Sequence, residues 1–362
     1  MNYERVADLP LTIEGVELER LERETPNDFT RVTTEITLVG SGTDGDGVTG
    51  TGGERVSGTG EDATYDADHH DSLAETGLPD LTGEYTLESF SAHLETVDLF
   101  PDDPPERTEF RNYRRWGLES AALDLALRTA EIDLASVFDR SFEPVRFVAS
   151  MRLGEPPSID RVETVLERVP DLGLKLDPTP EWDRDLVDAL VDTGAVRILD
   201  LKGQYEGTEV DAPGDPALYE LLVDSFPEAV VEDPALTAET APLFEDSGIR
   251  ERVSWDAQIH DLSDIEALPW EPSWLNVKPS RFGSLESVLE VIEYCAANGI
   301  RCYGGGQFEL GVGRGQIQAL ASICYPGGPN DVAPGVYNDV ALPEALPASP
   351  LEPPTDRIGF GW

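Results

Sequence analysis

The sequence predicts an α/β protein in which an α+β segment of about 140 residues precedes a closed barrel of parallel strands. The first observation is a period-two alternation of apolar and polar residues over 11–39, which is typical of antiparallel strands. The second is a change at Val145, after which short apolar runs alternate with amphipathic helical patterns about eight times. Such alternation predicts a parallel sheet, and eight units predict that the sheet closes, with a doubly wound open sheet as the alternative.

The first segment, 1–140, has three features. Residues 11–39 (LTIEGVELERL, then FTRVTTEITLVG) predict a β-meander, and 113–130 (YRRWGLESAALDLALRTA) has the periodicity of a long helix. Between them, 40–62 is Gly-rich, and we expect a mobile loop there that belongs to a lid over about 40–70. Strands followed by helices predict a small α+β domain.

The second segment, 141–335, contains the alternating units. The predicted strands are 145–151, 172–177, 196–203, 229–234, 252–256, 273–280, 300–306 and, less regular, 330–334. The predicted helices include 159–169, 183–194, 217–226, 240–248, 285–299 and 314–324. The remaining residues, 336–362, are Pro-rich and end in IGFGW, and we expect them to pack back on the first segment.

The charge balance excludes several classes of function. With 72 Asp and Glu against 26 Lys and Arg, the net charge is −46, which repels nucleic acids and anionic membranes. A folded chain of this kind suits a cell with molar salt, where the Debye length shrinks to about 3 Å. The sequence has three cysteines, no apolar run long enough to span a membrane and no secretory pattern at its N-terminus. These features predict a soluble cytoplasmic protein, and the charge predicts a halophilic organism.

Lysine is unusually rare in this chain. The 26 basic residues are 23 arginines and three lysines, Lys175, Lys202 and Lys278. A lysine that persists in such a sequence is a candidate for chemistry that arginine does not perform, since a desolvated lysine can act as a base.

Charged residues end five consecutive predicted strands. They are Lys175, Asp200, Glu232, Asp256 and Lys278, in strand order. The carboxyl ends of barrel strands converge on one face, so we expect these side chains to meet. Any one of the acids alone would be read as a helix N-cap, but five in register favour an active site. Three carboxylates suit Mg²⁺, or alternatively Mn²⁺.

This set has a chemical logic. The proton α to a carboxylate is very weakly acidic, and a divalent cation on that carboxylate stabilises the enediolate that forms when the proton leaves. A lysine near the cation can take or return the proton. We therefore expect Lys175 and Lys278 to be catalytic and Asp200, Glu232 and Asp256 to bind the metal.

At these residues the chain resembles the enolase superfamily, in the muconate-lactonizing-enzyme-like branch of the mandelate racemase group that includes o-succinylbenzoate synthases. NVKPSRFGSLESVLEVIEYCAANGI and YRRWGLESAALDLAL carry the resemblance together with the strand-end residues. The resemblance implies a modified (β/α)7β TIM barrel, 141–335, with an N-terminal α+β capping domain, 1–140. It also implies the metal and lysine roles given above.

The resemblance further suggests residues near the substrate. GEDATYD (60–66) is similar to the mobile capping loop, which brings in Glu61 and Tyr65, and GGGQFELGVGRG (304–315) places Glu309 and Gln307 at the rim. Glu309 is expected to hydrogen-bond Lys278 or the substrate, and the Gly-rich turn to offer backbone N–H groups to a substrate oxyanion. Lys202 stands where the family often has Asn, and it contacts the substrate, replaces a polar group around the metal, or balances the charge of the acid cluster. Asp331 joins the set.

Two other points bear on the site. Gly173 replaces the first lysine of the family's Lys-x-Lys, and Ala333 breaks the Asp-x-Asp pair of dipeptide epimerases after Asp331. His69 and His70 either border the lid or are solvated loop residues, and we favour the loop; His260 is expected to be a surface residue.

We therefore expect Mg²⁺-dependent abstraction of a proton α to a carboxylate by a lyase or cycloisomerase of the muconate or o-succinylbenzoate type. Sugar-acid dehydration and racemisation or epimerisation are the alternatives within the superfamily. A barrel that binds a metal or ligand without catalysis is the alternative from another class. The expected partner is a small carboxylate substrate, with neither nucleic acid nor membrane, in a homo-oligomer.

Overall fold

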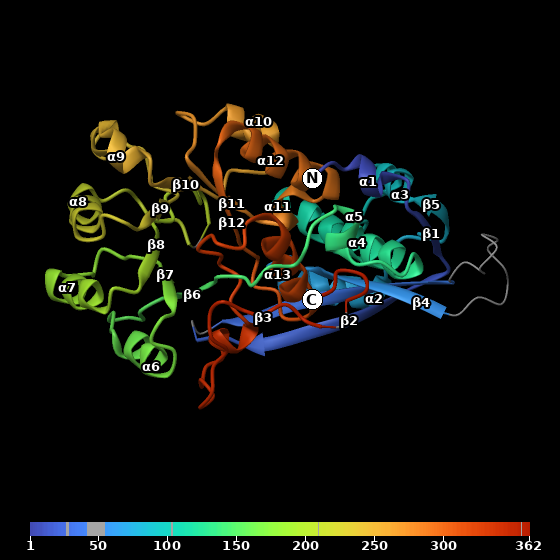
Figure 1. The fold of residues 1–362 in the computed structure, drawn as a ribbon, viewed down its shortest axis with the longest axis horizontal. Coiled ribbons are helices and arrows are strands. Elements are labelled where there is room, and N and C mark those ends of the chain that lie inside the picture. Colours follow the sequence, from blue (N-terminus) through green and yellow to red (C-terminus); the bar gives the residue numbers. More distant parts are fainter. Residues whose placement is uncertain (27–28, 42–54, 103, 209, 356) are drawn as a thin grey trace.

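A computed structural model describes residues 1–362 except 27–28, 42–54, 103, 209 and 356. The N-terminal part holds an antiparallel sheet, a two-stranded ribbon and several helices (Figure 1). Its elements are α1 (Glu4–Ala7), β1 (Pro10–Ile13), β2 (Gly15–Glu24), β3 (Thr30–Ser41), β4 (Arg55–Asp62), α2 (Ala67–Thr76), β5 (Gly83–Thr86), α3 (Leu87–Leu94), α4 (Glu109–Thr129) and α5 (Leu134–Val137).

The sheet β2-β3-β4 packs on the long helix α4. Gly58 in β4 is one of the points of close approach, because a Cβ there would lie 2.1 Å from the Leu125 nitrogen. A glycine is therefore needed for strand and helix to approach this closely. The prediction of a mobile loop over 40–62 is wrong for its second half, since Arg55–Asp62 pairs with β3 along its length. Part of the remainder of that prediction, 42–54, lies outside the described residues.

The C-terminal part is a curled sheet of seven parallel strands in sequential order, β6 to β12. The strands are β6 (Val148–Met151), β7 (Gly173–Leu176), β8 (Val196–Asp200), β9 (Val230–Glu232), β10 (Val253–Trp255), β11 (Trp274–Val277) and β12 (Arg301–Gly304). The helices between and after them are α6 (Asp160–Arg168), α7 (Arg184–Thr193), α8 (Pro216–Ser225), η1 (Ala241–Glu245), α9 (Ser247–Arg250), α10 (Leu262–Glu266), α11 (Pro279–Phe282), α12 (Leu285–Asn298), α13 (Val312–Cys324) and the short 3₁₀ turn η2 (Gly335–Asn338). Figure 1 shows α6 to α9 on the outer side of the strands.

The predicted last strand, 330–334, is reduced to single bridges. Asn330 forms a parallel bridge with Phe147, just before β6, and Asp331 forms one with Gly305, just after β12. The Asn330 side chain reinforces this position by accepting from Gly304 N at 2.7 Å and donating to Arg146 O at 2.9 Å. One short segment thus touches both edges of the parallel sheet.

The core is split between two layers. Outward-facing strand residues such as Leu199, Val231 and Trp255 belong to the main apolar core with the surrounding helices. Val148, Ile198, Val230 and Tyr303 form a small separate cluster. This alternation leaves the inward positions at the carboxyl ends of the strands free for polar side chains.

The C-terminal residues return to the N-terminal part of the chain. Gly359 exchanges backbone hydrogen bonds with Ile132 and Leu134, and Phe360 N donates to the Asp124 carboxylate on α4 at 3.0 Å. In the described part of the chain, no helix combines the length and the apolar character that crossing a membrane requires.

Candidate active site

The five predicted strand-end residues lie together at the carboxyl ends of β7 to β11. The Lys175 ammonium is 2.6 Å from Glu232 Oε1 and 3.1 Å from Asp200 Oδ2. The Lys278 ammonium is 2.7 Å from Asp256 Oδ2. All five side chains are buried. The expectation that strand ends bring these residues into one cluster therefore agrees with the geometry.

Local sequence explains how each side chain reaches the cluster. Asp200 and Glu232 occupy paired positions on β8 and β9, and Glu232 pairs with Ser254 on β10. Asp256 follows Ser254 by two residues, so it continues the same inward face. Asn276 Nδ2 and the Tyr303 hydroxyl donate to the two oxygens of Glu232, at 3.2 and 2.5 Å, and hold that carboxylate in place.

A fourth acid, Asp233, joins the cluster and was not predicted. One oxygen each of Asp200, Glu232 and Asp233 lies within 4.8 Å of the others. Asp233 has a positive φ of 48°, which breaks the strand alternation directly after Glu232. Its two carboxylate oxygens accept from the backbone N–H groups of Asp256 and Ala257, at 2.8 and 2.9 Å, and so tie β9 to β10.

Sequence reasoning also missed Arg281 and Tyr205. The buried Arg281 guanidinium lies 3.2 Å from Asp256 Oδ1 and donates to the Tyr205 hydroxyl at 3.2 Å. That hydroxyl donates in turn to Asp256 Oδ2 at 2.9 Å. The one available signal for Arg281 was its position three residues after Lys278, within KPSR.

The acids are crowded enough to favour an additional cation. Burial, followed by the charge of Asp200, raises the pKa of Glu232 to about 8. Burial and the charges of Asp256 and Asp200 raise the pKa of Asp233 to about 7. Burial opposes ionisation of Asp200 too, but the Lys175 and Lys202 ammonium groups outweigh it and hold its pKa well below the usual range.

The donor set fits a hard divalent cation. All candidate ligands are carboxylate oxygens, and the buried Asp256 Oδ1 has the ion pair with Arg281 but no hydrogen bond among the described residues. There are two candidate sets of three ligands, and both contain Asp200 and Glu232. The third ligand is Asp256 in the predicted set and Asp233 in the other. Because both Asp233 oxygens already accept backbone N–H groups, Asp256 is the better third candidate.

Comparison with known proteins identifies the family. Two models of a family described as a domain of unknown function, DUF8230, match residues 4–137 with the N-terminal domain and 141–339 with the C-terminal domain. The chain belongs to the DUF8230 family.

Curated relatives of this chain are enzymes. An N-succinylamino acid racemase from an Amycolatopsis species is 27% identical over 277 residues, 69% of this chain and 70% of that protein. An o-succinylbenzoate synthase from Geobacillus stearothermophilus is 26% identical over 309 residues, 78% of this chain and 77% of that protein. A match to the o-succinylbenzoate synthase of Listeria innocua is 36% identical over 84 residues, and it spans only 22% of either chain.

Solved structures agree on the fold. A member of the enolase superfamily from Listeria innocua superposes with a TM-score of 0.65 and 20% identity, covering 90% of this chain and 86% of that one. Muconate cycloisomerase from Pseudomonas fluorescens gives a TM-score of 0.66 with 17% identity, covering 97% and 96%. The comparisons agree with the expected resemblance at the level of the fold: this chain is folded like the enolase superfamily member from Listeria innocua and like muconate cycloisomerase, and its curated relatives are enzymes.

Lys202 and Asp331 lie beside the acid cluster, as expected. The Lys202 ammonium contacts Asp200 Oδ2, and Asp331 Oδ2 is 3.4 Å from the Lys175 ammonium. At Gly173, where the family often has a further lysine, there is little room for a side chain. A Cβ on Gly173 would lie 3.0 Å from side-chain atoms of both Val148 and Arg197.

Glu61 does not face the acid cluster. Its carboxylate accepts from the backbone N–H groups of Leu310, Gly311 and Gly313, at 2.7, 3.0 and 2.9 Å, at the N-terminus of α13. The prediction that the Gly-rich turn offers these N–H groups to a substrate is therefore wrong for the three that Glu61 occupies. Burial and the neighbouring Glu309 raise the pKa of Glu61 to about 7.

Glu309 and Gln307 belong to the same inter-domain contact. Glu309 Oε1 accepts from Gln307 N at 2.7 Å, and Oε2 is 3.7 Å from Arg314. Gln307 O accepts from the buried Arg31 of β3 at 2.9 Å. Among the contacts found within the described residues, none joins Glu309 to Lys278. Tyr65 is exposed, with its ring 4.3 Å from the Arg31 guanidinium carbon.

His69 and His70 correct another expectation. Both are buried on α2, and His70 Nδ1 and Nε2 contact Thr34 Oγ1 and Thr64 O at 2.8 Å each. Because a carbonyl only accepts, Nε2 carries the proton and Nδ1 accepts from the threonine. Burial lowers the pKa of His70, consistent with a neutral core residue. His260 is partly exposed and contacts Asp264, as a surface residue would.

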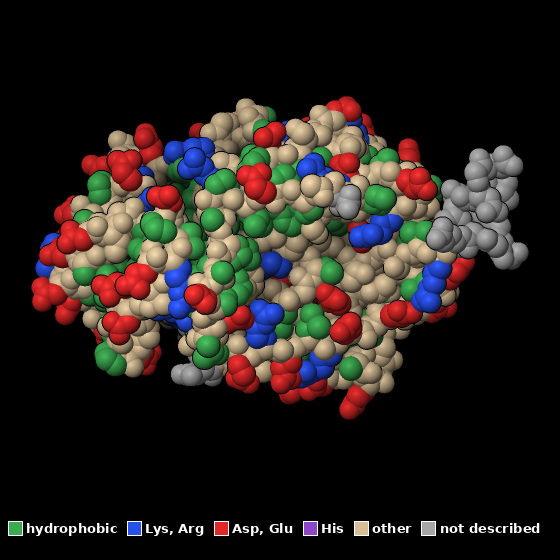
Figure 2. All heavy atoms as spheres, turned by 60° about the horizontal axis from the view of Figure 1, so that its bottom comes forward, with side chains coloured by type: hydrophobic (Ala, Val, Ile, Leu, Met, Phe, Trp, Pro, Cys, Tyr) green, Lys and Arg blue, Asp and Glu red, His purple; other side chains and the backbone are tan. Residues whose placement is uncertain are grey.

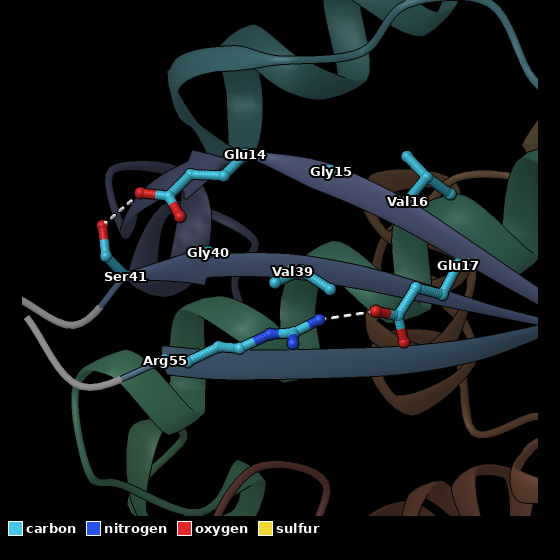
Figure 3. A pocket seen from close by; sticks show the side chains of 8 residues that line it. All are labelled: Glu14, Gly15, Val16, Glu17, Val39, Gly40, Ser41 and Arg55. Atoms are coloured by element: carbon cyan, nitrogen blue, oxygen red, sulfur yellow. Dashed lines mark hydrogen bonds and ion pairs between the residues drawn. The ribbon is translucent and has the colours of Figure 1, made fainter.

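Two surface cavities differ in their relation to the cluster. One of about 390 Å³ lies at the end of the β2-β3-β4 sheet, where Figure 3 shows Glu14 with Ser41 and Arg55 with Glu17. It contains none of the predicted site residues. Another of about 370 Å³ lies beside the carboxyl ends of β8 to β10. Its lining residues are Gly203, Gln204, Ala235, Leu236, Thr237, Trp255, Gln258 and Pro269.

Proposed function

We propose that this protein abstracts a proton α to a carboxylate in a Mg²⁺-dependent reaction of the lyase or cycloisomerase type. The observation that carries the proposal is the meeting of two lysines with three acids from adjacent strands. Mn²⁺ is the alternative ion, since it accepts the same oxygen ligands.

The proposed ligands are Asp200, Glu232 and Asp256, with Asp233 holding Asp256 by its backbone. A divalent cation bound there supplies charge that offsets the negative charge developing on the substrate carboxylate. The raised pKa of Glu232, caused by burial and by Asp200, supports the need for such a charge.

The lysines are proposed to move the proton. Lys175 stands on β7 and Lys278 directly after β11, at the two ends of the five consecutive strands. A substrate carbon above the acids would present one face to each lysine, so one removes the proton and the other returns it or faces the developing charge. Arg281 and Tyr205 keep the Asp256 carboxylate in position beside Lys278.

Relatives suggest the substrates to test. N-succinylamino acid racemisation and formation of o-succinylbenzoate are the activities in the names of the matched proteins. We rank the lyase or cycloisomerase reaction first. Racemisation is the second candidate, because a lysine on each side allows the proton to leave one face and return to the other. Sugar-acid dehydration and ligand binding without catalysis are the remaining alternatives.

The test is exchange of the α-proton with solvent. An N-succinylamino acid, the precursor of o-succinylbenzoate and a panel of sugar acids would be incubated with protein and MgCl₂ in D₂O at high KCl and followed by NMR. Arg301→Met is the control, because Arg301 is exposed on β12. The proposal is supported if the wild type and Arg301→Met catalyse exchange or turnover while Lys175→Met and Lys278→Met do not. Full activity in either lysine variant, or no exchange with any of these carboxylates, would overturn it.

Further features are proposed with this function. We take 1–140 as the capping domain and 141–335 as a (β/α)7β barrel that the bridges at Asn330 and Asp331 complete. The tail 336–362 is proposed to pack on the capping domain, which the Phe360 contact to Asp124 supports. Figure 2 shows acidic side chains spread over the outer parts of one face, which supports a salt-adapted protein. A cytoplasmic location and a homo-oligomeric state remain predictions.

A further inference from the structure

All three lysines of the chain contact the acid cluster. Lys175 and Lys202 both contact Asp200 Oδ2, and Lys278 contacts Asp256. Because 23 of the 26 basic residues are arginine, surface charge does not explain a lysine at position 202. The roles proposed for Lys175 and Lys278 leave this third ammonium without a function.

The backbone brings Lys202 back onto the residue two positions earlier. Lys202 has a positive φ of 54°, a conformation that side-chain-bearing residues adopt at a cost. Its N–H donates to Asp200 Oδ1 at 3.2 Å while its ammonium donates to Oδ2. The turn is anchored further along, since Ala212 N donates to Lys202 O at 3.1 Å and Gly203 N donates to Asp233 O at 2.8 Å. One residue thus engages both oxygens of a proposed metal ligand.

The two ammonium groups on Asp200 Oδ2 are held differently. Lys175 is also bound to Glu232 at 2.6 Å and lies 3.4 Å from Asp331. Lys202 has a second acceptor within reach, Asp177 Oδ1, at 3.8 Å. That oxygen is buried and has no hydrogen bond among the described residues, although Asp177 Oδ2 pairs with Arg152 at 3.2 Å. Lys202 therefore has an alternative site, and Lys175 is anchored by the cluster itself.

We propose that Lys202 is a tethered cation that competes with Mg²⁺ for Asp200 and moves to Asp177 when the metal binds. The inference rests on the proposed function, because it takes Asp200 to be a metal ligand. A divalent cation and an ammonium on the same carboxylate oxygen repel each other strongly in a buried site. Transfer of the ammonium to Asp177 relieves that repulsion and supplies the hydrogen bond that Asp177 Oδ1 lacks. The Tyr205 ring, 5.1 Å from the ammonium, lies beside it.

Calorimetric titration with MgCl₂ alone, at high KCl and without substrate, tests this. Lys202→Met is expected to bind Mg²⁺ at least about tenfold more tightly than the wild type. In the wild type the metal must first displace the charged hydrogen bond from Lys202 to Asp200, and a bond of this kind changes an equilibrium by about that factor or more. Asp177→Asn is expected to bind more weakly, because the displaced ammonium loses its charged acceptor. The double variant should behave like Lys202→Met, since Asp177 then has no ammonium to receive.

Arg197→Met is the matched control. It removes a positive charge from the same strand, β8, at an exposed position, and should leave Mg²⁺ affinity unchanged. Far-UV circular dichroism and thermal unfolding check that each variant is folded. The competition is overturned if folded Lys202→Met binds Mg²⁺ no more tightly than the wild type, or if the effects of the two substitutions on Mg²⁺ affinity are additive. In that case the proposed function still stands as long as the wild type binds one metal ion per chain. Absence of a Mg²⁺ site in the wild type overturns both.

Discussion

Arg31 offers a sharp test of how the two parts of the chain are held together. Its side chain is only 1% exposed, and all five of its N–H donors reach main-chain carbonyls. Three of the acceptors, Val32, Ala63 and Thr64, lie in the N-terminal part, and two, Gln307 and Phe308, lie in the loop before α13. Burial lowers the pKa of Arg31, because removing the charged guanidinium from water is unfavourable. The five hydrogen bonds of Arg31 all go to carbonyl groups and none goes to a carboxylate, so the carbonyls must offset this cost of desolvation.

Arg31→Lys is the informative substitution. It keeps the charge, but an ammonium has at most three donors, so at least two carbonyls lose their partner. Hydrogen bonds to charged groups contribute about 1.5–3 kcal/mol each, and two lost bonds give a destabilisation of about 3 kcal/mol or more. We expect this loss because neither orphaned carbonyl gains access to water in the buried site.

Urea unfolding at high KCl measures the effect, through the midpoint and the slope. Arg20→Lys on the neighbouring strand β2 is the control, because that guanidinium pairs with Asp71 and Glu22 at the surface. We expect the control to change the free energy of unfolding by less than about 0.5 kcal/mol. Equal costs for the two variants would refute the reasoning that the carbonyl contacts of Arg31 hold the interface.

Four further predictions follow from other parts of the structure. Arg114→Met should lower the free energy of unfolding by about 3–5 kcal/mol, because it leaves the buried Asp62, 2.7 Å from Arg114 Nε, without its counter-ion. Urea unfolding measures this change, and a loss below about 1 kcal/mol would contradict the prediction. Burial lowers the pKa of His70 below its ordinary value of 6.5, so the unfolded chain binds the extra proton and stability falls as pH drops through 6.5; His70→Gln should flatten this part of a melting-temperature profile, and an unchanged slope would argue against the assignment. Gly58→Ala should destabilise by about 2 kcal/mol or more because its Cβ would lie 2.1 Å from Leu125 N, whereas Gly15→Ala, with nothing within 4 Å, should be nearly neutral in the same thermal assay. The melting temperature should rise between about 0.1 M and about 2 M KCl as the charge of −46 is screened, and a flat response would disprove salt adaptation.

Much of the cluster of lysines and acids could be predicted because its signals are local. An apolar run followed by a charged residue indicates a strand end, and parallel strands bring their carboxyl ends to one edge. Lys175, Asp200, Glu232, Asp256 and Lys278 all follow this rule, and they meet as expected. Asp233 could not be predicted by this rule, because side chains of successive strand residues normally point to opposite faces. Its left-handed backbone turns the Asp233 side chain inward directly after Glu232, which also points inward.

The contact between the two parts of the chain could not be predicted. Glu61 was placed near the substrate from a local motif, but it pairs in register with Glu35 across β3 and β4, which puts both carboxylates on one side of the sheet. There they accept N–H groups at the start of α13, with Glu35 bonded to Val312 at 2.7 Å. The partners are about 250 residues or more away along the chain, so no sequence window contains both.

The sequence by itself determined the class of fold, the order of strands and helices and the five charged strand ends. It did so because hydrophobic periodicity and strand-to-helix alternation are properties of short windows. Only the tertiary structure decided that Arg281 and Tyr205 lie beside Asp256 and that Asp177 lies near Lys202. It also decided that His70 on α2 is buried against Thr34 and Thr64, away from this cluster. Such contacts depend on backbone turns and on the packing of distant segments, which no periodicity encodes.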